Sequence, residues 1–289
     1  IRTKVISMGT FLCGSLYAAF DTGTWSWVRF WTMAFAVLFV DMGTTGFNSY
    51  FDYVSGTDNK QYNLERDKVL VHEGVAPHVA LFISFSLFAA AGVLGLVLAW
   101  MTSWYLIPVG GICMIVGFLY TGGPLPISRT PFGELFAGGF LGTVLFTISY
   151  FVQAMQVNAR AMVVSLPLLL LIGMILTVNN TCDRIADKVA GRKTLSIILP
   201  FAMVRMLMRA MVIVSFALAI AFGATGMIPE ATVPFMAILF IPAWKTYREM
   251  ETRGFTLETK GPSMGSVSLI FLWYCLAFTL GMIGGVLFT

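Results

Sequence analysis

Charged residues are scarce in this chain. Only 11% of its 289 residues are Asp, Glu, Lys or Arg, whereas a soluble domain has about 25%. Hydrophobic residues make up 58% of the chain, and the mean hydropathy is +0.84. These values exclude an ordinary soluble protein and predict an integral membrane protein that lies in a lipid bilayer. The net charge of +4 is too small to indicate a nucleic-acid partner.

Closely spaced cysteine pairs are absent as well. The four cysteines stand far apart, mostly within apolar segments, and the chain contains no C-x-x-C motif. This spacing indicates neither a zinc site nor a disulfide framework. We expect the cysteines to serve in packing.

Nine apolar segments approach the length of roughly 20 residues that a membrane-spanning helix needs. They are Val5–Phe20, Phe30–Asn48, His78–Trp100, Tyr105–Tyr120, Phe132–Val152, Met162–Asn180, Pro200–Phe222, Ala231–Tyr247 and Ser266–Phe288. With the N-terminus inside, only Arg29 and Arg160 of the 18 lysines and arginines fall on the outer side, which leaves 16 on the inner side. Positive charge marks the cytoplasmic side. We therefore predict a multi-pass protein of the cell membrane with a cytoplasmic N-terminus.

The densest polar group follows the sixth apolar segment. At helical spacing, Asn180, Asp183 and Asp187 stand at i, i+3 and i+7 and share one face. Carboxylates at the end of a membrane helix are unfavourable without a cation, because of both dehydration and the helix dipole. Side chains with oxygen ligands suit Mg2+ better than zinc. We expect a cation beside this cluster.

A second cluster of the same design follows the second apolar segment. Asn48 and Asp52 are one helical turn apart, and we expect Gly56 to end the helix so that Asp58 extends from a loop. Basic residues follow both clusters, namely Lys60, Arg66 and Lys68 after the first and Lys188, Arg192 and Lys193 after the second. Two acidic clusters with flanking cations predict a cytoplasmic site where metal ions bridge a polyanion, for which diphosphate is the candidate.

The matching clusters suggest a duplication within the chain. Each cluster ends a helix and precedes a basic loop, as two copies of one four-helix unit would. We predict an all-α integral membrane fold of nine transmembrane helices, in two four-helix halves plus one, with a central cavity open to the cytoplasmic side. Residues 1–289 form a single domain.

Several other polar residues allow two interpretations each. Asp41 belongs to a polar stripe expected to face the bundle interior, where an interhelical hydrogen bond is the simpler role. His72 is either a proton acceptor or a solvated loop residue. Glu134 opens the fifth apolar segment, where the helix dipole alone would favour it, or it belongs to the active site. Lys245–Lys260 mixes charges of both signs and predicts a surface amphipathic helix.

The two clusters resemble the paired motifs of the UbiA superfamily of intramembrane aromatic prenyltransferases. That family carries an N-D-x-x-D motif in its first half and a D-x-x-x-D motif in its second. The corresponding residues here are Asn48, Asp52 and Asp58, then Asn180, Asp183 and Asp187. Ser49 stands where the commonest first motif has aspartate. Within the superfamily, the chain is most similar to the branch that prenylates 1,4-dihydroxy-2-naphthoate for menaquinone synthesis, on the segments Tyr50–Tyr53, Gly56–Asp58, Tyr120–Glu134 and Asn179–Leu195.

The resemblance implies a mechanism in which Mg2+, held by both clusters, binds the diphosphate of a polyprenyl diphosphate. It makes Asp52, Asp183 and Asp187 the catalytic groups. The side chains implied to neutralise the remaining diphosphate charge are Arg66, Lys68, Lys188 and Lys193. Those implied to contact the acceptor or move its proton are His72, Tyr120 and Glu134. Dihydroxynaphthoate would attack the allylic cation and lose CO2 to give a demethylmenaquinone.

Two alternatives stand beside this interpretation. Within the family, the acceptor could be a phenol, a chlorin, a haem or a lipid glycerol, or the reaction could be a terpene cyclisation with no acceptor. From a different class, a secondary transporter also has repeated halves and intramembrane acids. The acids here cluster at one membrane face rather than at the midplane, which favours the enzyme.

Overall fold

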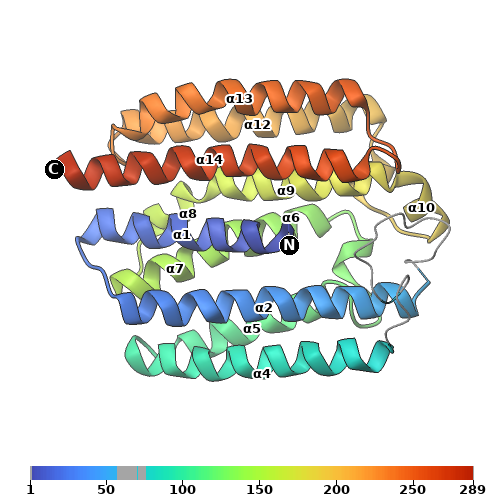
Figure 1. The fold of residues 1–289 in the computed structure, drawn as a ribbon, viewed down its shortest axis with the longest axis horizontal. Coiled ribbons are helices and arrows are strands. Elements are labelled where there is room, and N and C mark those ends of the chain that lie inside the picture. The colour runs from blue at the N-terminus through green and yellow to red at the C-terminus, as the bar shows by residue number, and fades with distance from the viewer. Residues whose placement is uncertain (1, 57–69, 71–75, 289) are drawn as a thin grey trace.

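The computed structural model describes residues 2–56, 70 and 76–288. These residues form a bundle of long helices whose axes run in roughly the same direction (Figure 1). The long unbroken helices are α1 (Arg2–Thr22), α2 (Trp27–Val54), α4 (Pro77–Met101), α5 (Leu106–Leu119), α12 (Phe201–Ala224), α13 (Thr232–Arg253) and α14 (Lys260–Phe288).

Two further helical rods are interrupted, and each consists of several consecutive helices. The first joins α6 (Gly133–Ala137), a π-helix η2 (Gly138–Val144) and α7 (Leu145–Ala154), and the second joins α8 (Ala159–Val164) and α9 (Leu166–Cys182). Three short helices lie at one end of the bundle, the end where Figure 1 labels α10. They are η1 (Ile127–Arg129), α10 (Arg184–Val189) and α11 (Leu195–Ile198). Each of the nine apolar segments predicted from the sequence lies largely within one of the nine rods formed by the described residues.

The composition of these helices is that of a membrane protein. Among the described residues, six helical stretches are long and apolar enough to cross a bilayer: Trp27–Val54, Pro77–Met101, Gly133–Ala154, Ala159–Cys182, Phe201–Ala224 and Lys260–Gly285. Large apolar side chains such as Phe82 and Trp100 are exposed on the outside of the bundle, where lipid replaces water as the solvent. The prediction of an all-helical membrane protein is confirmed.

The helix α1 connects two buried apolar clusters. The larger cluster is formed by residues of α1, α7, α8, α9, α12, α13 and α14. The smaller one places Phe11 of α1 against Met33 and Val37 of α2. Because α1 contributes to both clusters, it holds α2 and α9, the two helices that carry the polar motifs, in one bundle.

Glycines allow the rod that contains η2 to pack directly on the backbone of α9. A Cβ atom at Gly138 would lie 2.4 Å from the carbonyl oxygen of Leu169, and one at Gly142 would lie 2.6 Å from the Leu169 nitrogen. Only glycine permits such an approach, as is common between membrane helices. The close packing fixes the start of α6 beside α9.

One expectation about the chain's surface was wrong. Residues 245–260 do not form a separate surface helix, because 245–253 continue α13 without a break. Gly254, with φ of +83°, ends that helix, and α14 begins at Lys260. The charged residues instead join α13 to α12 through ion pairs of Glu251.

Candidate active site

The two polar motifs meet at one end of the bundle, where α2 and α9 finish and α10 begins (Figure 1). The contact between them is the guanidinium group of Arg192. Its Nη2 lies 3.2 Å from Asp52 Oδ1 and its Nη1 lies 3.2 Å from Asp187 Oδ1. All three side chains are largely buried. The helix ends that sequence reasoning expected to meet are therefore joined through the guanidinium group of Arg192.

A tight turn after α10 brings Arg192 into this position. The helix ends at Val189 with Ala190 as its C-cap, and Gly191 adopts a left-handed conformation with φ of +72°. The Arg192 N–H then donates to the Asp187 carbonyl at 2.9 Å, and the Gly191 N–H donates to the Lys188 carbonyl at 3.2 Å. These two bonds form a Schellman motif, for which glycine is the favoured residue. The chain reversal folds the Arg192 side chain back over Asp187.

Asp183 has a cationic partner from another part of the chain. The Nζ atom of Lys260, the first residue of α14, lies 2.8 Å from Asp183 Oδ2. Asp183 caps the end of α9, where the helix dipole is unfavourable for an anion. The expectation of a cation beside this cluster is thus met twice, by Lys260 at Asp183 and by Arg192 at Asp187.

A buried hydrogen bond adds Glu134 to the site. The Nδ2 group of Asn180 donates to Glu134 Oε1 at 2.8 Å, and both residues are buried. Glu134 lies in the first turn of α6, which the glycines of the adjoining η2 hold against α9. Its contact with Asn180 goes beyond what the helix dipole alone would require.

Residues at the end of α5 and just after it contact the first motif. The Thr121 hydroxyl donates to Asn48 Oδ1, and Phe118 packs edge-on against Phe51 with ring centroids 5.4 Å apart. Burial, with the negative charge of Glu134 as a second cause, raises the pKa of Tyr120 well above its ordinary value. This tyrosine therefore keeps its proton and remains a hydrogen-bond donor at neutral pH.

Burial and nearby cations have opposite effects on the pKa of Asp187. Burial raises the pKa of Asp187 to about 6, although Arg192 acts to lower it. Its Oδ2 atom and the Nε atom of Arg192 are buried and have no hydrogen-bond partner among the described residues. An unpartnered carboxylate oxygen in a buried position is a suitable ligand for a hard cation.

The oxygen ligands fit Mg2+, although they do not form a closed metal cage. Within 2–56, 70 and 76–288, no group of three or more His, Cys, Asp and Glu side chains is close enough to hold a metal ion. Arg192 instead lies between Asp52 and Asp187. The donor set consists of carboxylate and amide oxygens, as a magnesium site requires. Its members in the described part of the chain are Asn48, Asp52, Asn180, Asp183 and Asp187.

Comparison with known proteins agrees with this arrangement. Residues 7–254 match the model of the UbiA prenyltransferase family. The chain belongs to that family. It is a prenyltransferase, and the transporter alternative is excluded.

Several relatives and solved structures resemble this prenyltransferase. The 1,4-dihydroxy-2-naphthoate octaprenyltransferase of Bacillus subtilis (strain 168) is 34% identical over 240 residues, which cover 83% of this chain and 75% of that protein. The octaprenyltransferase of the same name from Mycobacterium tuberculosis (strain ATCC 25618 / H37Rv) is 32% identical over 74% of this chain and 72% of its own.

The solved structures establish the fold. The apo structure of a UbiA homologue from Aeropyrum pernix K1 superposes with a TM-score of 0.67 at 15% identity, covering 99% of this chain and 98% of that one. A UbiA homologue from Archaeoglobus fulgidus bound to GPP and Mg2+ gives a TM-score of 0.63 at 14% identity, with 96% and 98% covered. The prenyltransferase therefore has the UbiA fold.

The remaining predicted site residues of the prenyltransferase fall into two groups. Asp58, Arg66, Lys68 and His72 lie outside the described residues, so their roles stay predictions. Lys188 and Lys193 are exposed beside Asp187 in sequence, and neither forms an ion pair with a described residue. Their diphosphate-binding role also stays a prediction.

Sequence reasoning missed three members of the site. Sequence reasoning places Arg192 only in a basic run, although the preceding Gly191 indicates a turn that changes the direction of the chain at Arg192. Lys260 stands 77 positions after Asp183 and Thr121 stands 73 after Asn48. No local pattern predicts such long-range pairs.

The polar stripe on α2 is divided between two roles. Asp41 faces the bundle interior as expected, with Lys4 Nζ 3.9 Å from its Oδ2. The same ammonium group donates to Thr45 at 3.0 Å. Asp41 therefore joins α1 to α2, as the simpler interpretation proposed, while Asn48 bonds Thr121 and Asp52 pairs with Arg192.

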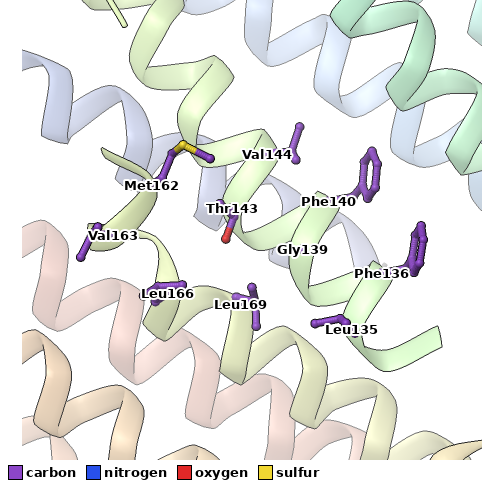
Figure 2. A pocket seen from close by; sticks show the side chains of 10 residues that line it. All are labelled: Leu135, Phe136, Gly139, Phe140, Thr143, Val144, Met162, Val163, Leu166 and Leu169. Atoms are coloured by element: carbon purple, nitrogen blue, oxygen red, sulfur yellow. The ribbon is translucent and has the colours of Figure 1, made fainter. Parts of the chain in front are cut away.

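An apolar cavity of about 470 Å³ lies elsewhere, between the η2 rod and α8–α9. Figure 2 shows its lining of aliphatic and aromatic side chains, with Thr143 as the one hydroxyl among them. None of the motif residues lines it. The cavity is therefore separate from the candidate active site.

Proposed function

We propose that this prenyltransferase transfers a polyprenyl chain to 1,4-dihydroxy-2-naphthoate, with loss of CO2, to give the reduced quinol form of a demethylmenaquinone. Prenyl transfer from an isoprenyl diphosphate follows from family membership. The naphthoate acceptor is supported by the names of the relatives at 34% and 32% identity. The contact that supports the site is the Arg192 bridge between Asp52 and Asp187.

The metal in this proposal is Mg2+, as in the Archaeoglobus fulgidus homologue. The residues that would hold it are Asn48, Asp52, Asp58, Asn180, Asp183 and Asp187. When bound, Mg2+ neutralises the diphosphate and stabilises the negative charge that grows on it as the C–O bond breaks. The buried Oδ2 of Asp187, which has no hydrogen-bond partner among the described residues, supports its assignment as a ligand.

The chain's own cations prepare the site for a polyanion. Arg192 pairs with Asp52 and Asp187, and Lys260 pairs with Asp183, which keeps these cations beside the carboxylates. We assign the remaining charge of the leaving diphosphate to the basic residues Arg66, Lys68, Lys188 and Lys193. Fixed cations that face the developing charge lower the barrier without reorganisation during the reaction.

The buried groups beside the motifs are placed to act on the acceptor. Tyr120 retains its proton and so serves as a hydrogen-bond donor to an acceptor oxygen. Glu134 and His72 are the candidates for moving a proton on the acceptor: a base that takes a proton from the ring as the new C–C bond forms returns one to the carbon from which CO2 departs. The allylic carbon loses its bond to diphosphate, which departs with the electron pair, and the electron-rich ring supplies the new C–C bond.

The proposal includes a membrane arrangement. Nine helices span the bilayer as two four-helix halves plus one, the N-terminus and the active site face the cytoplasm, and a central cavity holds the prenyl chain. Sixteen of the 18 basic residues support that orientation, since only Arg29 and Arg160 fall on the other side. Apolar helix walls would keep water from capturing the allylic cation.

One experiment tests both levels of the proposal. The purified protein is incubated with Mg2+, farnesyl diphosphate and a panel of acceptors, namely dihydroxynaphthoate, 4-hydroxybenzoate and a glycerol phosphate lipid, and the products are identified by mass. We expect prenylated, decarboxylated naphthoquinol and no product in EDTA. A product only with another acceptor would reject the naphthoate assignment, and diphosphate release without any acceptor would indicate a cyclase.

A further inference from the structure

Away from the candidate active site, three arginines converge on one carboxylate between α12 and α13. The Nη2 group of Arg209 donates to both oxygens of Glu251, at 2.9 and 3.0 Å. Arg205 approaches the same carboxylate with its Nε at 3.6 Å, and Arg248 does so with its Nε at 3.9 Å. We call Arg205, Arg209 and Arg248 the arginine cluster.

The charges of this cluster do not balance. Three guanidinium groups face a single carboxylate, which leaves two positive charges without an ion-pair partner among the described residues. The arginine side chains are 46%, 44% and 59% exposed, whereas that of Glu251 is 8% exposed. Glu251 is therefore the internal anchor, and the arginines form the outer surface.

The anchor is itself held in place. The Tyr247 hydroxyl lies 3.2 Å from Glu251 Oε1 and 3.2 Å from the carbonyl oxygen of Arg205. Tyr247 is buried and stacks on Trp244. The carboxylate and the arginines that it orients thus form a fixed arrangement, which lowers the entropy lost when a ligand binds.

Part of the hydrogen-bonding capacity of the cluster is unused. Each guanidinium has five N–H groups, and Arg205 and Arg248 turn Nε toward Glu251. No hydrogen bond within the described residues uses the Nη groups of these two arginines. An anion with several oxygens, such as a phosphate group, can accept paired bonds from them.

The surroundings of the cluster identify the source of that phosphate. Exposed apolar side chains continue from it along both helices, with Met206 63% exposed on α12 and Ile241 68% exposed on α13. Ile241 precedes Arg248 by seven residues, about two turns along the same face. In Figure 1 the start of α12 and the end of α13 lie at the same end of the bundle as α10. In the membrane arrangement proposed above, this end of the bundle lies at the headgroups, so the cluster would stand where a lipid-facing surface reaches them.

We propose that the arginine cluster binds the phosphate group of an anionic phospholipid, with Met206 and Ile241 against its acyl chains. A lipid supplies both parts of the ligand, whereas a free phosphate would leave Met206 and Ile241 without a contact. The two uncompensated charges give the site a preference for a net anionic headgroup over a zwitterionic one.

The test compares three ligands on the full-length protein in detergent. Phosphatidylglycerol, phosphatidylcholine and soluble glycerol phosphate are titrated, and the retained lipid is measured by native mass spectrometry beside the melting temperature. We expect phosphatidylglycerol to bind and stabilise best. Equal stabilisation by glycerol phosphate would overturn the lipid assignment, and equal binding of phosphatidylcholine would overturn the anionic preference.

A pair of matched variants tests the residues. Arg205→Gln/Arg248→Gln keeps Arg209 on Glu251 and should weaken phosphatidylglycerol binding about 30-fold, from about fivefold per arginine. Lys245→Gln/Arg253→Gln removes the same charge from exposed positions of α13 and should change binding less than about twofold. Equal losses in both pairs would mean unspecific attraction and would reject the site.

A single substitution covers the case in which the double variant does not fold. Arg248→Lys keeps the charge but lacks the planar fork of donors. We expect it to fold and to lose much of the preference for phosphatidylglycerol over phosphatidylcholine. Full retention of that preference would show that the cluster only joins α12 to α13, and the proposal would fail.

Discussion

Asp52 of α2 and Asp187 of α10 share one guanidinium, that of Arg192, at 3.2 Å from each carboxylate. The two aspartates are 135 positions apart, so the contact exists only because both halves of the bundle end at the same place. Without the arginine, two largely buried anions would face each other.

Replacing Arg192 should impair the activity of the site more strongly than its position in a basic run of the sequence indicates. Arg192→Ala leaves both carboxylates without their cation, which costs about 3 kcal/mol at a largely buried pair. We expect turnover to fall roughly 10- to 100-fold and Mg2+ to raise the melting temperature more than in the wild type. A variant with normal turnover and an unchanged response to Mg2+ would refute the bridging role.

The motif aspartates should be essential for turnover and dispensable for folding. Asp52→Ala and Asp183→Ala each remove a proposed metal ligand, and we expect product formation to fall at least about 100-fold. Circular dichroism should show a folded protein. Glu249→Gln, which removes an exposed carboxylate on α13, is the control and should keep its activity; substantial product from either aspartate variant would contradict the ligand assignment.

Lys260 should affect substrate affinity through Asp183. Lys260→Met keeps the aliphatic stem but removes the ammonium group 2.8 Å from the carboxylate. We expect the KM for the prenyl diphosphate to rise several-fold, because Asp183 loses the cation that positions it. Lys245→Met, on the exposed surface of α13, serves as comparison. Equal KM values for the two variants would exclude a positioning role.

Glu134 should matter for chemistry rather than for diphosphate binding. Glu134→Gln preserves the shape and can still bond Asn180 after an amide flip, so stability should change by less than about 1 kcal/mol. We expect kcat to fall while the KM for the diphosphate stays within about twofold. If KM rises and kcat does not change, Glu134 belongs to the diphosphate subsite instead.

The glycines of η2 offer a test of the packing that positions Glu134. Gly138→Ala puts a Cβ atom 2.4 Å from the Leu169 carbonyl, so the two helices must separate. We expect a loss of about 1–3 kcal/mol in unfolding measured in detergent, with reduced turnover. Gly139→Ala has no atom within 4 Å of its new methyl group and should have almost no effect. Similar losses in both variants would disprove the close-approach argument.

Much of the candidate site was predictable because its signals are local. Asn180, Asp183 and Asp187 repeat at helical spacing directly after an apolar run, and so do Asn48 and Asp52 in the first half. The family resemblance rested on these same residues and is confirmed by the match over residues 7–254. The partners Arg192, Lys260 and Glu134 received their places only from contacts between distant segments.

The sequence by itself determined that the chain is a helical membrane protein and which polar groups stand at the helix ends. It could do so because hydrophobic length and helical period are properties of neighbouring residues. Only the tertiary structure decided which cation pairs with which carboxylate. Those pairings depend on how the helices pack, and a close approach such as that of Gly138 to Leu169 leaves no trace in the spacing of either segment.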